Sequence, residues 1–221
     1  MSKLVLFDID KTLLKSSNGH RLAFAEAFKK VYRVNTNINV INHHGMTDQQ
    51  IIIEVLKKNG IKEKEIKSKL KNCMAEMVEF YKKISGEDEV ILLSDVRETL
   101  DALRKEGNIL FGLVTGNLEP IAWGKLNKVG IDSYFIAGGF GSDDINRTNL
   151  IKLAVKRAED KFSIQFNDIF LVGDTPSDIR AGKEAKVKTV GVATGIYTKG
   201  ELKRAGADYV VTNLKGLLEI I

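Results

Sequence analysis

The sequence predicts an α/β fold: a three-layer, Rossmann-like parallel sheet core with an inserted α-helical domain. Short apolar runs with strand character alternate with amphipathic helical patterns in the second half of the chain. Such alternation is typical of a parallel sheet covered by helices on both faces. The first run, residues 4–7, is separated from the second by residues 8–108, and most of that long segment has a helical pattern. Acidic and small polar residues directly follow three of the runs.

Residues 4–7 (LVLF) predict a buried strand, because four consecutive apolar residues include β-branched and aromatic types. The other predicted strands are 109–114, 134–137, 169–172 and 189–192, with a weaker one at 209–211. The helical patterns between them are 95–106, 119–129, 148–160, 177–185, 199–205 and 214–220. Asp95 and Glu98 have the spacing of a capping box at the first of these helices.

The segment after the first strand is interpreted as an inserted helical module. Its helical patterns are 22–32, 47–60 and 63–84, whereas a crossover in an α/β domain needs only about a dozen residues. We therefore expect a catalytic core made of residues 1–14 and 91–221, and a helical cap domain of residues 15–90. Insertions at such positions often act as lids that exclude water and select substrate.

The composition is that of a soluble globular protein, with 43% hydrophobic and 29% charged residues. No apolar stretch approaches the ~18 residues that span a membrane, and Lys3, Asp8 and Asp10 interrupt any signal-peptide pattern. Cys73 is the single cysteine, so no internal disulfide can form. These features favour a cytoplasmic protein without a membrane partner.

The net charge of +5 does not indicate nucleic-acid binding. The lysines are dispersed among glutamates, as in residues 57–71, and this mixture is typical of a solvated helix surface. We therefore expect a small anionic partner and no nucleic acid, while the oligomeric state stays open.

The residues that follow the strands indicate where the chemistry takes place. In open parallel sheets the functional crevice lies at the carboxyl ends of the strands. The residues at three such ends are Asp8, Asp10 and Thr12; Thr115, Gly116 and Asn117; and Gly173, Asp174 and Asp178. Three polar ends that converge in one crevice are poorly explained as ordinary turn residues.

Four carboxylates at one point need a cation, and oxygen ligands without a nearby His or Cys favour Mg²⁺. The hydroxyl of Thr115 and the backbone at Gly116 can bind an anion. Arg147 directly precedes a predicted helix, so its guanidinium can bind one too. Carboxylates, Mg²⁺ and an anion site together predict phosphoryl transfer, in which an aspartate can be the nucleophile.

The pattern Asp8-x-Asp10-x-Thr12, Thr115 after a second strand, a basic residue before a later helix, and Gly173-Asp174-x-x-x-Asp178 resemble the four motifs of the haloacid dehalogenase-like superfamily. The helical insertion resembles the cap of its phosphoglycolate phosphatase type. The resemblance covers essentially the whole chain. It implies a Mg²⁺-dependent phosphatase that acts on a small phosphorylated metabolite.

The resemblance also implies roles for single residues. Asp8 would be the nucleophile that forms an aspartyl-phosphate, and Asp10 the general acid and base. The metal would be held by Asp8, the carbonyl of Asp10, Asp174 and Asp178. The phosphoryl group would be bound by Thr115, Gly116, Asn117 and Arg147, with Thr12 bracing the loop. His44 and Thr47 of the cap are candidate substrate contacts, whereas His20 is expected at a surface or structural position.

Some alternatives stay open. The basic residue of the third motif is usually a lysine, which Arg147 replaces without being equivalent; Lys152, a turn or more inside the helix, is the other candidate. A sugar-phosphate mutase often has an acidic pair where this sequence has Gly173 and Asp174. A non-catalytic regulator that binds phosphate or metal is a further alternative. The sequence does not select among phosphoglycolate, sugar phosphates, nucleotide monophosphates and pyrophosphate as the substrate.

Overall fold

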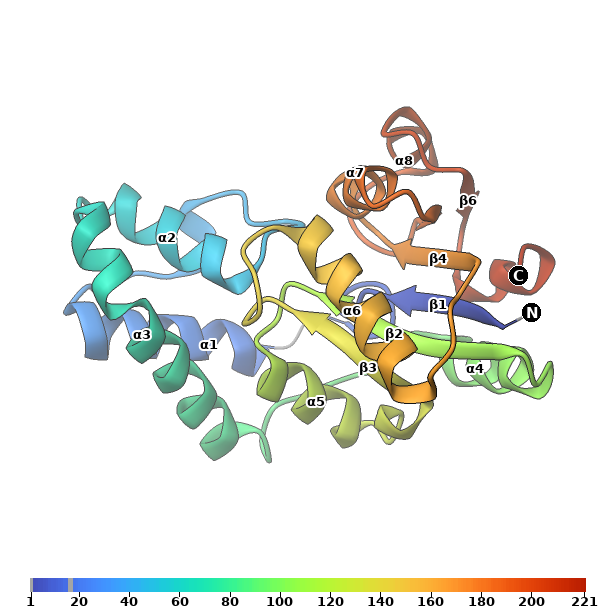
Figure 1. The fold of residues 1–221 in the computed structure, drawn as a ribbon. Helices are drawn as coiled ribbons and strands as arrows, with labels where there is room; N and C mark the ends of the chain where they lie inside the picture. Colours follow the sequence, from blue (N-terminus) through green and yellow to red (C-terminus); the bar gives the residue numbers. More distant parts are fainter. Residues whose placement is uncertain (1, 16–17) are drawn as a thin grey trace.

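The computed structural model describes residues 2–15 and 18–221, and its core is a six-stranded sheet (Figure 1). The strands lie in the order β3-β2-β1-β4-β5-β6, and every neighbouring pair is parallel. Their bounds are β1 Lys3–Phe7, β2 Ile109–Thr115, β3 Phe135–Phe140, β4 Asp168–Gly173, β5 Lys188–Val192 and β6 Tyr209–Val211. The predicted α/β fold with a Rossmann-like sheet is confirmed.

Two layers of helices cover this sheet because its strands are apolar on both faces. Val5 and Phe7 of β1 pack with α4 (Val96–Lys105), α5 (Glu119–Lys128) and the 3₁₀ helix η4 (Leu214–Glu219). Leu4 and Leu6 pack with α6 (Arg147–Phe162) and α7 (Pro176–Glu184) on the opposite face. The short helix α8 (Lys199–Arg204) packs near β5 and β6, and the 3₁₀ turn η3 (Asp132–Tyr134) precedes β3.

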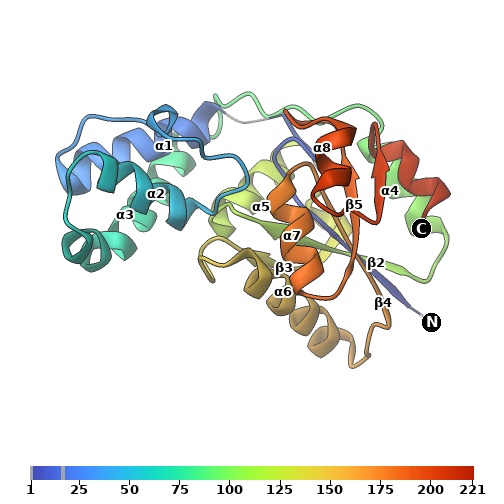
Figure 2. The ribbon, with the colours of Figure 1, turned by 90° about the horizontal axis from the view of Figure 1, so that it is seen from above.

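The helical insertion follows β1 in the sequence and has an apolar cluster to which its helices contribute most of the residues. It consists of α1 (Asn18–Ala27), the π-helical turn η1 (Phe28–Tyr32), the 3₁₀ turn η2 (Ile38–Val40), α2 (Asp48–Lys58) and α3 (Glu63–Ile84). Phe24, Phe28, Ile52 and Met77 are buried together there. The insertion lies beyond the arrowheads of β1 and β4 in Figure 1, and to one side of the sheet in Figure 2.

The insertion and the sheet are joined through two connections and one shared helix. The two connections run side by side, since Leu14 pairs with Leu92 and the Lys15 amide donates to Ile91 O over 2.8 Å. Helix α5 contributes to both apolar clusters: Leu118, just before it, and Ile121 belong to that of the insertion, while Ala122 and Leu126 belong to that of the sheet. Helix α5 therefore forms the seam between the two parts.

The predicted capping box at α4 is wrong. Asp95 is the N-cap residue, but its φ of 64° is left-handed and its side chain makes no capping hydrogen bond. The Asp95 carboxylate instead accepts from Asn213 Nδ2 over 3.2 Å. A partner distant in sequence thus replaces the local one. None of the helices in the described part of the chain combines the length and apolar composition that crossing a membrane requires.

Candidate active site

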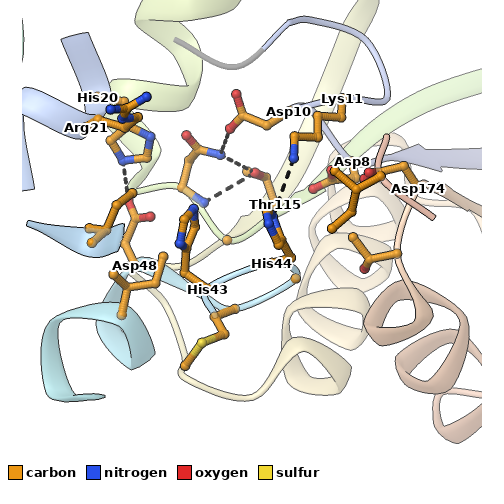
Figure 3. A pocket seen from close by; sticks show the side chains of 18 of the residues that line it. Asp8, Asp10, Lys11, His20, Arg21, His43, His44, Asp48, Thr115 and Asp174 are labelled. Atoms are coloured by element: carbon orange, nitrogen blue, oxygen red, sulfur yellow. Dashed lines mark hydrogen bonds and ion pairs between the residues drawn. The ribbon is translucent and has the colours of Figure 1, made fainter. Parts of the chain in front are cut away.

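A cavity of about 400 Å³ lies where the carboxyl ends of the strands meet the helical insertion. Figure 3 shows Asp8 and Asp174 on one side of it and His20, Arg21 and Asp48 on the other. Most of the residues that the sequence singled out line this cavity: Asp8, Asp10, His44, Thr115, Gly116, Asn117, Arg147 and Asp174. The topology brings them together because the first strand, β1, lies between β2 and β4.

Asp8, Asp174 and Asp178 form a buried group whose carboxylate oxygens lie within 4.8 Å of one another. Asp178 is fixed by the capping box of α7, since its Oδ2 accepts from the amide and the hydroxyl of Thr175 over 3.0 and 2.6 Å. Asp174 Oδ2 is buried and has no hydrogen-bond partner among the described residues. A Cβ on Gly195 would lie 1.8 Å from that oxygen, so only glycine fits beside it.

These carboxylates are held in an environment that disfavours their charge. Burial raises the pKa of Asp8 well above its ordinary value, and the nearby Asp178 raises it further. The same two causes raise the pKa of Asp174 to about 7. Arg147 partly opposes them, with Nη1 at 2.5 Å from Asp178 Oδ1 and 3.4 Å from Asp8 Oδ1. The buried group can therefore hold a metal ion, and its all-oxygen ligands suit a hard divalent cation.

Asp10 lies in a different environment from Asp8. Burial pushes its pKa upward, but the charge of Lys125 and the hydrogen bonds from Lys125 and Asn117 act in the opposite direction, and the pKa is lowered. Lys125 Nζ contacts Oδ1 and Oδ2 of Asp10 at 2.9 and 2.8 Å, and Asn117 Nδ2 donates to Oδ2 over 2.8 Å. Two neighbouring carboxyls whose pKa values are shifted apart are typical of a site that needs both a nucleophile and an acid–base group.

The residues after β2 link the site to the helical insertion. Thr115 is fully buried, and its Oγ1 accepts from Asn117 Nδ2 over 2.7 Å. The Gly116 carbonyl accepts from the Asp48 amide over 2.8 Å. A Cβ on Gly116 would lie 2.5 Å from the Met46 carbonyl oxygen. Glycine at this position therefore allows the loop before α2 to rest directly on the end of β2.

The remaining predicted residues lie at the edge of the cavity or behind it. His44 Nδ1 is 3.4 Å from Lys11 Nζ at the cavity wall. Thr47 is fully buried outside the lining, where its hydroxyl accepts from the Gln50 amide as the N-cap of α2. Thr12 is buried, and its hydroxyl has no partner within the described residues. Lys152 is exposed on α6, whereas Arg147 is buried beside Asp8.

The cavity also contains residues that the sequence did not single out: Lys11, Arg21, Asp48 and Lys125. His20, expected at a surface or structural position, lines the cavity as well, and its Nε2 is 2.9 Å from Asp48 Oδ2. One signal for Lys125 existed. It shares a helical face with Ile121, Ala122 and Leu126, so its spacing places a charge on the buried side of α5.

The comparisons with known proteins agree with this geometry. The family model for haloacid dehalogenase-like hydrolases matches residues 5–192. The chain belongs to this family. It is similar to a phosphoglycolate phosphatase of Vibrio vulnificus, with 28% identity over 221 residues that cover 99% of this chain and 96% of that protein. It is also similar to the pyrophosphatase PpaX of Oceanobacillus iheyensis, with 26% identity over 223 residues and the same coverage of 99% and 96%.

A solved structure of a hydrolase from Pseudomonas syringae has the same fold. It superposes with a TM-score of 0.71 at 22% identity, over 99% of this chain and 97% of that one. This haloacid dehalogenase-like protein is therefore an enzyme of a hydrolase family. Both relatives described above, which match nearly its whole length, carry phosphatase names.

Proposed function

We propose that the protein is a Mg²⁺-dependent phosphatase that hydrolyses a small phosphate monoester through an aspartyl-phosphate on Asp8. One observation carries the proposal. Asp8 is buried at a cavity with the Arg147 guanidinium on one side and the carboxylates of Asp174 and Asp178 close by. A nucleophilic carboxylate, an anion-binding cation and a set of hard oxygen ligands are the parts that phosphoryl transfer to an aspartate requires.

In this proposal the two carboxylates after β1 have separate tasks. A carboxylate oxygen of Asp8 forms a bond to phosphorus while the bond to the ester oxygen breaks. Asp10, after its carboxylate has taken up a proton from water, gives that proton to the ester oxygen. A water molecule then attacks the phosphorus, Asp10 accepts its proton, and the bond to Asp8 breaks to release phosphate. Thr115 and Arg147 bind the phosphoryl oxygens during both steps.

A metal ion would be held by Asp8, Asp174 and the Asp10 carbonyl, with Asp178 assisting. The buried, unpartnered Oδ2 of Asp174 and the raised pKa values of Asp8 and Asp174 support this assignment. When bound, Mg²⁺ supplies positive charge to phosphoryl oxygens and lowers the repulsion between carboxylates.

The lining of the cavity supports a small anionic substrate beneath a cap formed by residues 15–90. Arg21 contributes positive charge on the side away from Asp174, and Lys11 contributes it near Asp8 and Asp174. His43 and His44 also line it, and burial lowers both pKa values, so these rings are neutral at pH 7 and can accept hydrogen bonds. A cavity of about 400 Å³ suits a small phosphorylated metabolite.

The geometry around Gly173 argues against the mutase alternative. A Cβ at this position would lie 2.4 Å from the carboxyl carbon of Asp178. The acidic pair that a mutase often has at positions 173 and 174 therefore does not fit with Asp178 as it is placed here. A non-catalytic regulator would bind Mg²⁺ and phosphate without turnover.

Phosphate release tests the proposal, first with p-nitrophenyl phosphate and then with a panel of alkyl phosphate monoesters, with Mg²⁺ or EDTA. We expect turnover that needs Mg²⁺ and is lost in Asp8→Asn, which keeps the shape of the side chain but removes the attacking charge. Asp160→Asn is the matched control, because Asp160 is exposed on α6. Turnover that survives in Asp8→Asn would exclude the aspartyl-phosphate, and metal binding without any turnover would favour the regulator.

A further inference from the structure

Lys125 is a buried cation at the seam between the helical insertion and the sheet. Its side chain is only 1% exposed, and lysines are almost never buried to this degree without partners. Its ammonium contacts both carboxylate oxygens of Asp10, Asn117 Oδ1 at 2.6 Å and His20 Nδ1 at 3.1 Å. Lys125 thus bridges the carboxylate proposed as the acid–base group and a histidine of the insertion.

The donor and acceptor roles in this network follow from the chemistry of the ammonium group. An ammonium has only donors, so His20 Nδ1 must accept and the ring proton lies on Nε2. That Nε2–H donates to Asp48 Oδ2 over 2.9 Å, and the same oxygen accepts from the Leu118 amide over 2.9 Å. The hydrogen-bond network Asp10–Lys125–His20–Asp48 therefore joins the core to the insertion. Asp10 and Lys125 belong to the core, His20 and Asp48 belong to the insertion, and Asp48 is bonded to the core again at Leu118.

We propose that Lys125 is a positioning residue that orients the Asp10 carboxylate for proton transfer and is itself oriented by His20 and Asp48 of the helical insertion. The inference rests on the proposed phosphatase function. A carboxylate held at both oxygens by one ammonium, and at Oδ2 also by Asn117, cannot rotate freely about its Cβ–Cγ bond. The orientation of Asp10 then depends on how the insertion packs against the core, because His20 and Asp48, two of the four groups in the network, belong to the insertion.

If the ion pair between Lys125 and Asp10 had only a structural role, a different result would be expected. Buried ion pairs can often be replaced by apolar residues of similar volume without loss of stability. A structural role would also affect every substrate equally. A positioning role acts only through Asp10, so its loss must depend on how much the leaving group needs a proton.

A double-mutant cycle with two substrates tests this difference. Lys125→Met keeps the length of the side chain and removes its charge, and Asp10→Asn removes the group on which Lys125 acts. Lys128→Met on the same helix is the matched control, since Lys128 is exposed and its ammonium donates to the Ser85 and Gly86 carbonyls. The substrates are p-nitrophenyl phosphate, whose leaving group needs no proton, and the alkyl phosphate that the wild type hydrolyses fastest.

We expect Lys125→Met to lower kcat/KM for the alkyl phosphate at least about tenfold more than for the aryl phosphate, since general acid catalysis contributes about 10²-fold or more. In the Asp10→Asn background the same substitution should change kcat/KM by less than about twofold, because groups that act as one unit are not additive. Equal losses on both substrates, or losses that multiply in the double variant, would overturn the inference.

Failure to fold and failure of the proposed function can both be recognised. If thermal denaturation shows that Lys125→Met is unfolded, His20→Phe removes an acceptor of the ammonium from the insertion and must give the same substrate-dependent loss. A wild type without any turnover would overturn the proposed function and this inference with it. If the wild type is active but the losses in kcat/KM from Lys125→Met and Asp10→Asn multiply in the double variant, this inference alone is overturned.

Discussion

Arg147 donates from Nη1 to Asp178 Oδ1 over 2.5 Å, while the same nitrogen lies 3.4 Å from Asp8 Oδ1. The guanidinium is thus anchored on Asp178, the N3 residue of the α7 capping box, rather than on the proposed nucleophile. An anchored cation beside a less tightly bound carboxylate leaves Asp8 able to react while the positive charge stays in place.

Replacing Arg147 tests this arrangement. Arg147→Met should lower kcat/KM by about a hundredfold or more, since charged groups that stabilise transferring phosphoryl oxygens contribute on that scale. It should also reduce the free energy of unfolding by about 3–5 kcal/mol, because carboxylates stay buried without their partner. Enzyme kinetics and urea unfolding measure the two effects. Lys152→Met, exposed on the same helix, should change neither; an equal effect there would contradict the assignment of Arg147.

Addition of Mg²⁺ should raise the Tm of the wild type, because a ligand that binds only the folded state stabilises it. The gain is about 2.7 kcal/mol at a hundred times the Kd. Asp174→Asn should abolish most of this Tm shift, since it removes a charge from the buried ligand set. Differential scanning fluorimetry with a Mg²⁺ titration and an EDTA blank measures it. Asp160→Asn should keep the full shift, and an unchanged shift in Asp174→Asn would place the ion elsewhere.

Gly116→Ala should impair activity by displacing the helical insertion from the end of β2. The new Cβ would lie 2.5 Å from the Met46 carbonyl oxygen, which belongs to backbone and cannot rotate away. We expect kcat/KM to fall at least about tenfold, as expected when catalytic groups are displaced by about 1 Å. Gly86→Ala is the matched control, since its Cβ would meet nothing within 4 Å. Kinetics on both variants, with Tm values to show that they fold, decide the point.

Cys73 reports on the helical insertion. Burial raises the pKa of its thiol from 9.0 to about 12, so at pH 8 the folded protein should resist thiol reagents that label unfolded chains. The folded pKa lies above the unfolded one, so the thiol's contribution to stability is complete below pH 9 and is lost as the pH rises towards 12.

The free energy of unfolding should therefore fall by about 1.4 kcal/mol per pH unit from this group between those limits. Urea unfolding at pH 8 and pH 10 measures the loss in the wild type. Cys73→Ala corrects for all other titrating groups. Identical pH dependence in the two proteins would show that the thiol titrates normally in the folded state.

The strand-end residues could be predicted from the sequence because a parallel sheet has a fixed direction. Once Asp8, Thr115 and Asp174 were placed after apolar runs of one parallel sheet, the shared strand direction required their side chains to lie at the same edge. Of the two candidates for the basic residue, Arg147 at the start of α6 lies beside Asp8, whereas Lys152 inside the helix is exposed.

Residues that reach the cavity from outside the sheet edge could not be placed in the same way. Lys125 lies inside α5 and His20 inside α1, and their meeting at Asp10 depends on how the insertion packs on the core. The capping box expected at Asp95 failed for a related reason, because Asn213, 118 positions away, offers a better partner. Long-range packing decided each of these outcomes, and local spacing carries no information about it.

Helix α5 has a consequence for exchanging parts between family members. Its residues Ala122 and Leu126 pack in the apolar cluster of the sheet, whereas Ile121 and the preceding Leu118 pack in the apolar cluster of the insertion. In a chimaera that takes only residues 15–90 from a relative, the new insertion would have to pack against Leu118 and Ile121 of this protein. Its apolar surface would not be complementary to these two side chains. The segment to exchange is therefore discontinuous in sequence. It consists of the insertion and the residues of α5 that pack against it, and α5 follows the insertion by some thirty residues.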